Sequence, residues 1–214
     1  MNDSNLLERA AMTIRKLRWL PVGLLGWLAV SILASQPGAA QPAATPPAAA
    51  ATRVAFDTSE GRIVIELRAD KAPKTVANFV QYVNDGFYDG TVFHRVINSF
   101  MIQGGGFTAA MVQKPTRAPV PSESNNGLKN LRGAVAMART SDPNSATAQF
   151  FINVVDNARL DYPSFDGYGY TVFGNVVEGI DVVDKIRAVA TGRREGFENV
   201  PLTPVVIKTA RIAK

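Results

Sequence analysis

The segment TVFHRVINSFMIQGGG (residues 91–106) decides the fold, because it places polar side chains inside two apolar, strand-like runs. Side chains two residues apart share a face of a strand, so Arg95 is expected on the same face as Phe93 and Ile97. Arg and Gln are usually exposed, and beside large apolar side chains they need hydrogen-bond partners. The first run therefore predicts a guanidinium on an apolar sheet face.

The same pattern of a polar residue beside a large apolar one occurs twice more. Gln103 shares a face with Met101 in the second run of the segment, and Gln149 shares one with Phe151 in a later run. The pattern alone leaves two interpretations open, a binding site or a hydrogen-bonded polar network on the outside of a barrel.

From Arg53 onward the chain has the pattern of short strands and two helices. A helix that opens at Pro73 carries apolar residues at i, i+3, i+4 and i+7, namely Val76, Phe79, Val80 and Val83, and ends at Asp85-Gly86. A second short helix is expected at 179–188. Strands are expected at 53–57 and 62–67, joined by a turn at 58–61, and near 91–97, 101–104, 133–138, 148–153, 170–174 and 205–212.

Many short strands with two isolated helices favour an antiparallel barrel over alternating βαβ units.

The triplet Gly104-Gly105-Gly106 predicts a tight turn, because no Gly-Lys-Ser/Thr follows it as in a phosphate-binding loop. Residues 105–132 then form a loop of more than twenty residues, and loops of that length are commonly functional. We expect this loop to form one wall of a site.

The composition excludes several classes of chemistry. The chain has no cysteine, which excludes disulfides, thiolate metal sites and a cysteine nucleophile. His94 is the only histidine and no Gly-x-Ser-x-Gly motif is present, so neither a zinc site nor a Ser-His-Asp triad is expected. The net charge is +5, but no run of Lys or Arg follows the first forty residues, so nucleic-acid binding is not expected. Three carboxylates of a turn-rich segment are expected to be solvated or to cap turns: Asp156, Asp161 and Asp166.

The N-terminal residues have the organisation of a secretory signal. Residues 1–18 are polar and basic toward their end, residues 19–33 are apolar, and Gly38-Ala39-Ala40 supplies the small residues that suit a signal peptidase. The sequence therefore predicts a signal over 1–40, with Gln41 as the new N-terminus after cleavage.

Two features of this region stay open. Translation can start at Met1 or at Met12, and the apolar run is shorter than the roughly 20 residues of a membrane span, yet an uncleaved anchor remains the alternative to cleavage. In that case contact with the membrane is confined to this N-terminal segment. Residues 41–52 are rich in Ala and Pro, and they predict a disordered linker.

Four motifs together resemble those of the cyclophilin family. They are FHRVI-x-x-FMIQGG (93–105), GAVAMAR (133–139), SATAQFFI (145–152) and VFG (172–174). They occur in the order and at the spacings typical of the family, and the likeness extends from about Arg53 to Ile212. Within the family the chain is most similar to the bacterial periplasmic cyclophilins. This agrees with the signal sequence and predicts a periplasmic location.

The resemblance implies a mainly β fold over residues 53–214, a closed eight-stranded antiparallel β-barrel capped by two α-helices. It implies a binding groove on the outer face of the barrel and the isomerisation of peptide bonds that precede proline. The implied partners are proline-containing segments of unfolded or folding exported proteins, with no cofactor, metal or nucleic acid, and we expect a monomer.

Carried over residue by residue, the resemblance makes Arg95 the catalytic group. It implies that Gln103 and Gln149 contact the peptide, and that Ala138 and Arg139 fall where the backbone pairs with the substrate. Tyr170 falls where many relatives carry a His at the edge of the site. The proline pocket is then lined by Phe100, Met101, Phe151 and Leu160. Nearby Asn153, Asn157 and Asp161 are assigned to the turn rather than to the site.

The sequence also departs from the family pattern. Arg159 falls where many eukaryotic members carry a Trp that contacts cyclosporin, which leaves tight binding of that drug open. Asn98-Ser99 replaces the Pro-Gly that commonly precedes Phe100, and Asn tolerates turn conformations, so the turn is expected to survive. These departures keep an alternative function open, a chaperone module that binds prolines with little turnover. A purely structural role would leave the arginine, glutamine and aromatic residues unexplained.

Overall fold

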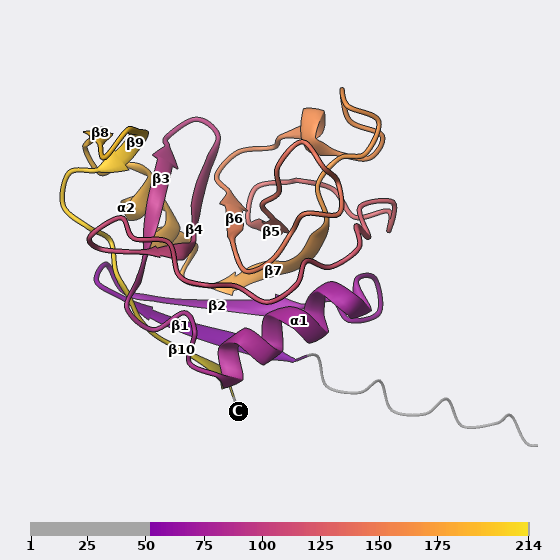
Figure 1. The fold of residues 1–214 in the computed structure, drawn as a ribbon, viewed down its shortest axis with the longest axis horizontal. Coiled ribbons are helices and arrows are strands. Elements are labelled where there is room, and N and C mark those ends of the chain that lie inside the picture. The colour runs from indigo at the N-terminus through magenta and orange to yellow at the C-terminus, as the bar shows by residue number, and fades with distance from the viewer. Residues whose placement is uncertain (1–51, 214) are drawn as a thin grey trace, which may run out of the picture. The chain divides into compact units, whose positions relative to one another are not determined.

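Ten strands and two α-helices follow one another along residues 52–213, the part of the chain that this computed structural model describes (Figure 1). The predicted signal at 1–40 and the linker at 41–52, except Thr52, lie outside the described residues. The elements are β1 Arg53–Thr58, β2 Arg62–Leu67, α1 Pro73–Asn84, β3 Thr91–Ile97, β4 Met101–Thr108, β5 Ala134–Met137, β6 Phe150–Asn153, the 3-10 helix η1 Ala158–Leu160, β7 Val172–Glu178, α2 Ile180–Arg187, β8 Thr191–Arg194, β9 Phe197–Pro201 and β10 Ile207–Ala213.

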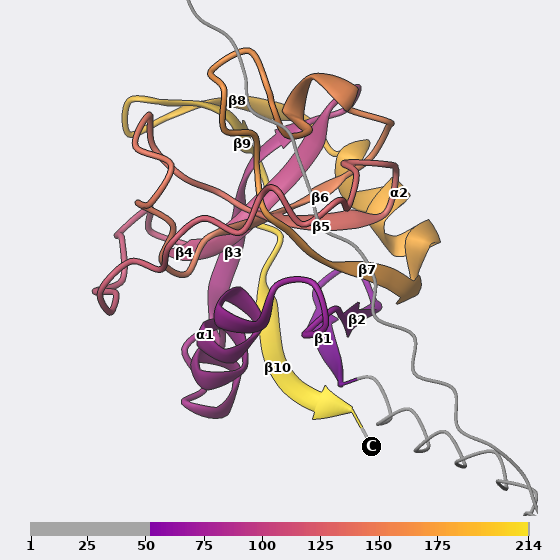
Figure 2. The same cartoon turned by 90° about the vertical axis from the view of Figure 1, so that its right-hand side faces the viewer.

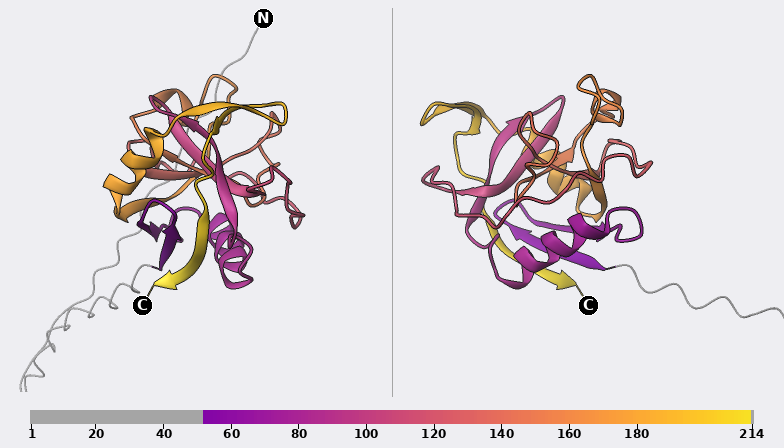
Figure 3. Two further views of the ribbon diagram at one scale, coloured as in Figure 1. Left: turned by 90° about the vertical axis from the view of Figure 1, so that its left-hand side faces the viewer. Right: turned by 45° about the vertical axis from the view of Figure 1, so that its right-hand side comes forward.

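Eight of these strands form one antiparallel sheet in the order β10-β1-β2-β7-β5-β6-β4-β3. The sheet curls until its two edges meet, where the N–H of Phe93 donates to the carbonyl of Val205 (3.0 Å) and that of Gly90 to the carbonyl of Ile207 (2.8 Å). The predicted eight-stranded antiparallel barrel is therefore confirmed. Figures 2 and 3 show α1 and α2 on opposite sides of it.

The barrel interior is filled by aromatic rings that α1 helps to enclose. Phe79 of α1 lies 4.8 Å from the ring of Phe173 and 5.2 Å from that of Tyr88, measured between ring centroids. The periodicity of α1 predicts Val76, Phe79 and Val83 on its buried face, whereas Val80 is only partly buried. Thr75 and Tyr82 are buried as well. Within residues 52–213, no helix has the length and hydrophobicity needed to cross a membrane.

A carboxylate from the long connection between β4 and β5 caps the N-terminus of α1. The side chain of Glu123 accepts hydrogen bonds from the N–H groups of Lys74 (3.1 Å) and Thr75 (2.8 Å) and from the Thr75 hydroxyl (2.7 Å). The first N–H groups of a helix have no partner within it, and they favour negative charge. Glu123 therefore both stabilises α1 and fixes the connection against the barrel.

The glycine triplet does not form the predicted turn but lies inside β4, so the long connection spans 109–133 and the prediction of 105–132 was wrong at its start. Gly105 has φ +80°, and a Cβ there would lie 2.8 Å from the ring of Phe150. A Cβ on Gly106 would lie 2.5 Å from the side chain of Gln149. Glycine is therefore needed here for close packing of a distorted strand rather than for a reversal of the chain.

The hairpin of β8 and β9 was not predicted from the sequence. Its turn at Glu195-Gly196 has φ +48° and +80°, and most of its side chains are exposed. The hairpin contacts the barrel through Phe197, whose ring lies 5.2 Å from that of Phe107 in β4. With so few apolar residues, the segment shows no strand-like alternation in its sequence.

Replacing Glu123 with Ala removes the cap of α1, and we expect the free energy of unfolding to fall by about 1–2 kcal/mol. Urea unfolding followed by circular dichroism measures this change. Glu178→Ala is the matched control, because Glu178 is exposed at the end of β7. An equal loss in both variants would contradict the capping role.

Candidate active site

The register of four neighbouring strands brings two of the predicted polar residues, Arg95 and Gln103, into one row with two apolar residues. Arg95 of β3 pairs with Gln103 of β4, Gln103 with Phe151 of β6, and Phe151 with Ala136 of β5. Directly opposed residues of antiparallel strands point to the same side of the sheet. This side is the outer face of the barrel, because Phe151 and Ala136 belong to an apolar cluster separate from the interior core, which contains the adjacent Phe150.

One sequence expectation about this face was wrong. Phe93 belongs to the interior core, whereas Arg95 and Ile97 lie on the outer side. The register between β3 and β4 shifts at this point, so that His94 is an extra residue without a partner in β4. Such a bulge reverses the face of the residues that follow it, and strict alternation cannot anticipate this.

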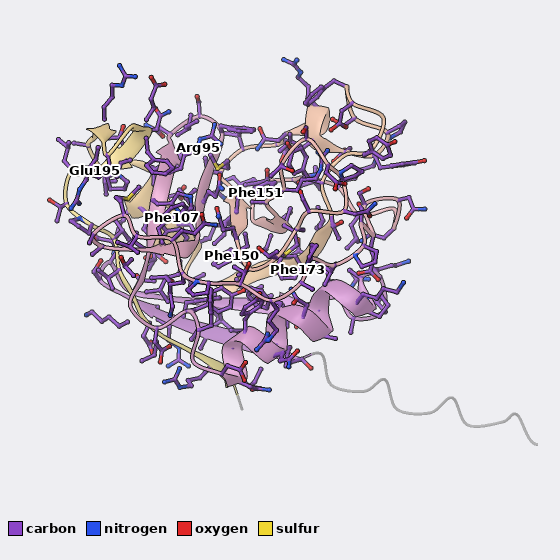
Figure 4. The ribbon with its side chains drawn as sticks, in the orientation of Figure 1. Arg95, Phe107, Phe150, Phe151, Phe173 and Glu195 are labelled. Atoms are coloured by element: carbon purple, nitrogen blue, oxygen red, sulfur yellow. The ribbon has the colours of Figure 1, made fainter. Side chains whose placement is uncertain are left out.

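The outer face carries a small cavity of about 100 Å³. Its apolar wall continues into a cluster of buried residues that includes Met101, Phe151 and Leu160. Figure 4 shows Arg95 and Phe151 on this side of the barrel, with Phe150 and Phe173 lying deeper in its interior. Every residue that lines the cavity had been singled out from the sequence: Arg95, Phe100, Met101, Gln103, Ala138, Arg139, Phe151, Leu160 and Tyr170.

The guanidinium of Arg95 is held by an amide relay. Its Nη1 donates to Oε1 of Gln103 (3.4 Å), and Nε2 of Gln103 donates to Oε1 of Gln149 (3.0 Å). Among the described residues no carboxylate forms an ion pair with Arg95. Its positive charge is therefore uncompensated at the pocket, and other N–H donors remain available for a ligand.

Gln149 lies just outside the pocket and lines a neighbouring polar cavity of about 370 Å³. This second cavity shares Gln103, Ala138 and Arg139 with the pocket. Its further lining residues come from two loops and show no pattern in the sequence that marks them: Gln113, Thr116, Thr140, Ser145 and Thr147. Two of them lie in the long connection that was expected to form a wall of the site.

Arg139 lies in a different environment from Arg95, because its charge is paired with a carboxylate. Its side chain is only 4% exposed, forms an ion pair with Asp166, and donates from Nε (3.0 Å) and Nη2 (2.9 Å) to the carbonyl of Gly169. Its guanidinium carbon also lies 4.4 Å from the centroid of the Tyr170 ring. Arg139 therefore fastens the loop beside the pocket and supports Tyr170, whose ring in turn lies 5.7 Å from that of Phe151.

Asp166 is consequently more than the capping residue that the sequence indicated. The hydrogen bond from Arg139, aided by those from the N–H groups of Tyr168 and Gly169, lowers the pKa of its carboxyl to about 2. Asp156 and Asp161 accept backbone N–H groups of Arg132 and Asn130, as expected of capping residues.

The backbone of Phe100 is held by Asn157, a residue predicted to belong to the turn. Nδ2 of Asn157 donates to the carbonyl of Phe100 (2.9 Å), which also accepts the N–H of Val154 (3.1 Å). The turn before Phe100 is closed by a bond from its N–H to the carbonyl of Ile97 (2.9 Å), so Asn98-Ser99 preserves it. Asn157 is therefore a positioning residue for one wall of the pocket.

Comparison with known proteins shows the family. The sequence model described as “Cyclophilin type peptidyl-prolyl cis-trans isomerase/CLD” matches residues 53–212. The chain belongs to the cyclophilin-type peptidyl-prolyl cis-trans isomerases. A peptidyl-prolyl cis-trans isomerase of Streptomyces antibioticus is 60% identical over 161 residues, covering 74% of this chain and 97% of that protein. Peptidyl-prolyl cis-trans isomerase B of Escherichia coli K12 is 56% identical over 163 residues, covering 75% of this chain and 99% of that protein.

A solved structure agrees with the fold. The crystal structure of a cyclophilin-type isomerase from Cryptosporidium parvum superposes with a TM-score of 0.65 at 24% identity, covering 77% of this chain and 98% of that one.

Within residues 52–213 of this cyclophilin, no group of three or more His, Asp or Glu residues is arranged to hold a metal ion.

The single histidine of this cyclophilin lies away from the pocket. His94 is 5% exposed beside Phe107 (4.6 Å between ring centroids), and its Nδ1 has no hydrogen-bond partner in the described residues. Burial lowers the pKa of His94 to about 4, although the carbonyl of Val92 opposes this and Arg95 adds to it.

We expect this histidine to make the fold sensitive to acid. The unfolded chain takes up a proton near pH 6.5 but the folded chain only near pH 4, so the free energy of unfolding falls as the pH drops between these values. The loss should be on the order of 3 kcal/mol. Urea unfolding across this window measures it, and His94→Leu should flatten the curve. An unchanged pH dependence in that variant would contradict the assignment.

Proposed function

We propose that this cyclophilin accelerates X–Pro isomerisation in exported proteins as they fold, with Arg95 as its catalytic residue. One observation carries the proposal: an uncompensated guanidinium, oriented by an amide relay, borders an apolar pocket on a rigid sheet. The pocket would hold the proline ring, and the polar cavity beside it would hold the neighbouring backbone.

The reaction that this site would catalyse breaks no covalent bond. The barrier, about 18–20 kcal/mol, arises because the amide loses its resonance as it twists. The cis and trans states of an X–Pro bond differ by only about 0.5–1 kcal/mol, so a catalyst must act on the barrier. In the twisted transition state the proline nitrogen is pyramidal and carries a free lone pair. A donor directed at that nitrogen stabilises the transition state more than either ground state.

Arg95 suits this task because its guanidinium stays protonated and presents several donors in a fixed geometry. The apolar wall formed by Met101, Phe151 and Leu160 excludes water and strengthens a hydrogen bond made inside the pocket. Gln103 and Gln149 can hold the peptide on one side of the bond while the other side rotates. The proposed mechanism needs neither a base nor a nucleophile nor a cofactor.

The N-terminal sequence supports an exported protein. Basic, apolar and small-residue regions follow one another over residues 1–40, as in a secretory signal. Isomerisation of X–Pro bonds takes tens to hundreds of seconds without catalysis and slows folding. An isomerase that needs no ATP suits a compartment outside the cytoplasm, and we propose the periplasm.

Replacing Arg95 with Ala removes the donor that would meet the proline nitrogen. We expect kcat/KM on a short X–Pro peptide to fall by about 10²–10³-fold. Other enzymes lose activity by this factor when one hydrogen-bond donor to the transition state is removed. Arg95→Lys keeps the charge but loses the planar fork of donors, so an intermediate loss is expected. A coupled isomerase assay at low temperature measures all variants.

Arg194→Ala serves as the control, since Arg194 is exposed on the β8–β9 hairpin. Circular dichroism and thermal unfolding would show that each variant folds. Wild-type activity at background level, or an Arg95→Ala variant as active as the control, would contradict the proposal. Full protection of an aggregating client by the inactive variant would instead favour the chaperone alternative.

The predicted signal can be tested by mass. In bacteria that express the full chain, the exported protein is expected in the periplasmic fraction with Gln41 as its first residue. Intact mass spectrometry and N-terminal sequencing give this directly. Full-length chain in the membrane fraction would show an uncleaved anchor, and recovery only from the cytoplasm would contradict export.

A further inference from the structure

A third cavity adjoins the proposed proline pocket and is lined by an unusually exposed aromatic ring. The side chain of Phe165 is 75% exposed, the largest value for any large apolar residue among those described. It borders a cavity of about 490 Å³ together with Phe100, Leu160 and Arg159. We propose that this cavity binds an aromatic side chain of the polypeptide whose proline occupies the first pocket, an inference that rests on the proposed function.

The loop that carries Phe165 is tightly fastened, so the exposure of the ring does not come from a loose chain. Asp166 forms an ion pair with the buried Arg139 and accepts the N–H groups of Tyr168 (3.0 Å) and Gly169 (3.2 Å). The hydroxyl of Ser164 donates to the carbonyl of Arg159 (2.6 Å). A single exposed apolar side chain is ordinary, but Phe165 lies with Phe100 and Leu160 around one cavity, and contiguous apolar surface of this kind is typical of a binding site.

The two cavities form a continuous surface because they share a wall. Phe100 and Leu160 line both the proline pocket and the larger cavity. An extended chain advances about 3.3–3.6 Å per residue, so residues two to four positions from a bound proline can pass over this wall. The polar cavity beside Gln103 and Gln149 is reached across Ala138 and Arg139 instead, so an aromatic residue should be favoured on only one of the two sides of the proline.

The lining favours an aromatic occupant. Phe165 and Phe100 can pack against a ring at the offset or edge-on geometries that aromatic pairs prefer. The exposed side chain of Arg159 has no ion pair among the described residues and can lie over the face of a bound ring. Folded proteins bury their aromatic residues, so such a subsite selects unfolded clients.

The test compares a short Ala-rich X–Pro core peptide with a series that carries one Phe two, three or four residues before or after the proline. For each protein the readout is the ratio of kcat/KM on the Phe peptide to that on the core peptide. For the wild type we expect a ratio of about 3–10 for Phe on one side, mainly through a lower KM. In Phe165→Ser the ratio should fall to about 1.

Tyr168→Ser is the matched control, because Tyr168 is 51% exposed in the same loop but borders a different cavity with Tyr162. Its ratio should equal that of the wild type. Three results would overturn the inference: wild-type ratios near 1 at every position, equal ratios in wild type and Phe165→Ser, or self-association through Phe165 detected by light scattering at assay concentrations. Absence of activity on the core peptide would instead overturn the proposed function, so the two failures are distinguishable.

Discussion

The position of Arg95 depends on two offset bulges in the register between β3 and β4. His94 has no partner in β4, and Gly105 and Gly106 have none in β3. Without the extra residue, alternation would direct Arg95 toward the aromatic interior that Phe93 occupies, where an unpaired guanidinium would be very costly. With it, the same strand supplies both a core residue and a charged residue on the outer face. The glycines accommodate the distortion, because any side chain there would collide with Phe150 or Gln149.

The strands that hold the site are also the walls of the packed barrel, and this limits how far its side chains can move. Met101 and Phe151 of the outer cluster alternate with Ile102 and Phe150 of the interior core along β4 and β6. Packed interiors resist displacement, so the row from Arg95 to Ala136 keeps its geometry without a ligand. The loops around the row are fastened in turn, one through Glu123 at the helix terminus and another through Asp166 and Arg139.

The sequence identifies the residues that line this pocket because the family motifs mark them, and strand alternation agrees with the motifs in β4 and β6, although not at Phe93 in β3. Gln103 and Met101 lie together as alternation requires, and all nine pocket-lining residues were identified. The failures have different physical causes. The bulge at His94 depends on tertiary pairing with β4, which no pattern within β3 reveals. Apart from Pro201, Phe197 and Val200 are the only apolar side chains of β8 and β9, too few to show a period. Asp166 and Gly169, which hold the Arg139 guanidinium, lie 27 and 30 residues away along the chain, and only folding brings them together.

Arg139 and Arg95 both lie beside the pocket, but only the charge of Arg139 is neutralised by a carboxylate, and this difference determines their roles. Arg139 is buried, but its charge is balanced by Asp166 and its donors are occupied by backbone carbonyls, so little of its field remains for a ligand. Arg95 lacks such a carboxylate among the described residues and is bound only by the neutral amide of Gln103. A neutral partner orients a guanidinium without cancelling its charge. The guanidinium of Arg139 therefore has a structural role, whereas that of Arg95 can act electrostatically on a ligand. The difference lies in the hydrogen-bond and ion-pair partners of each side chain.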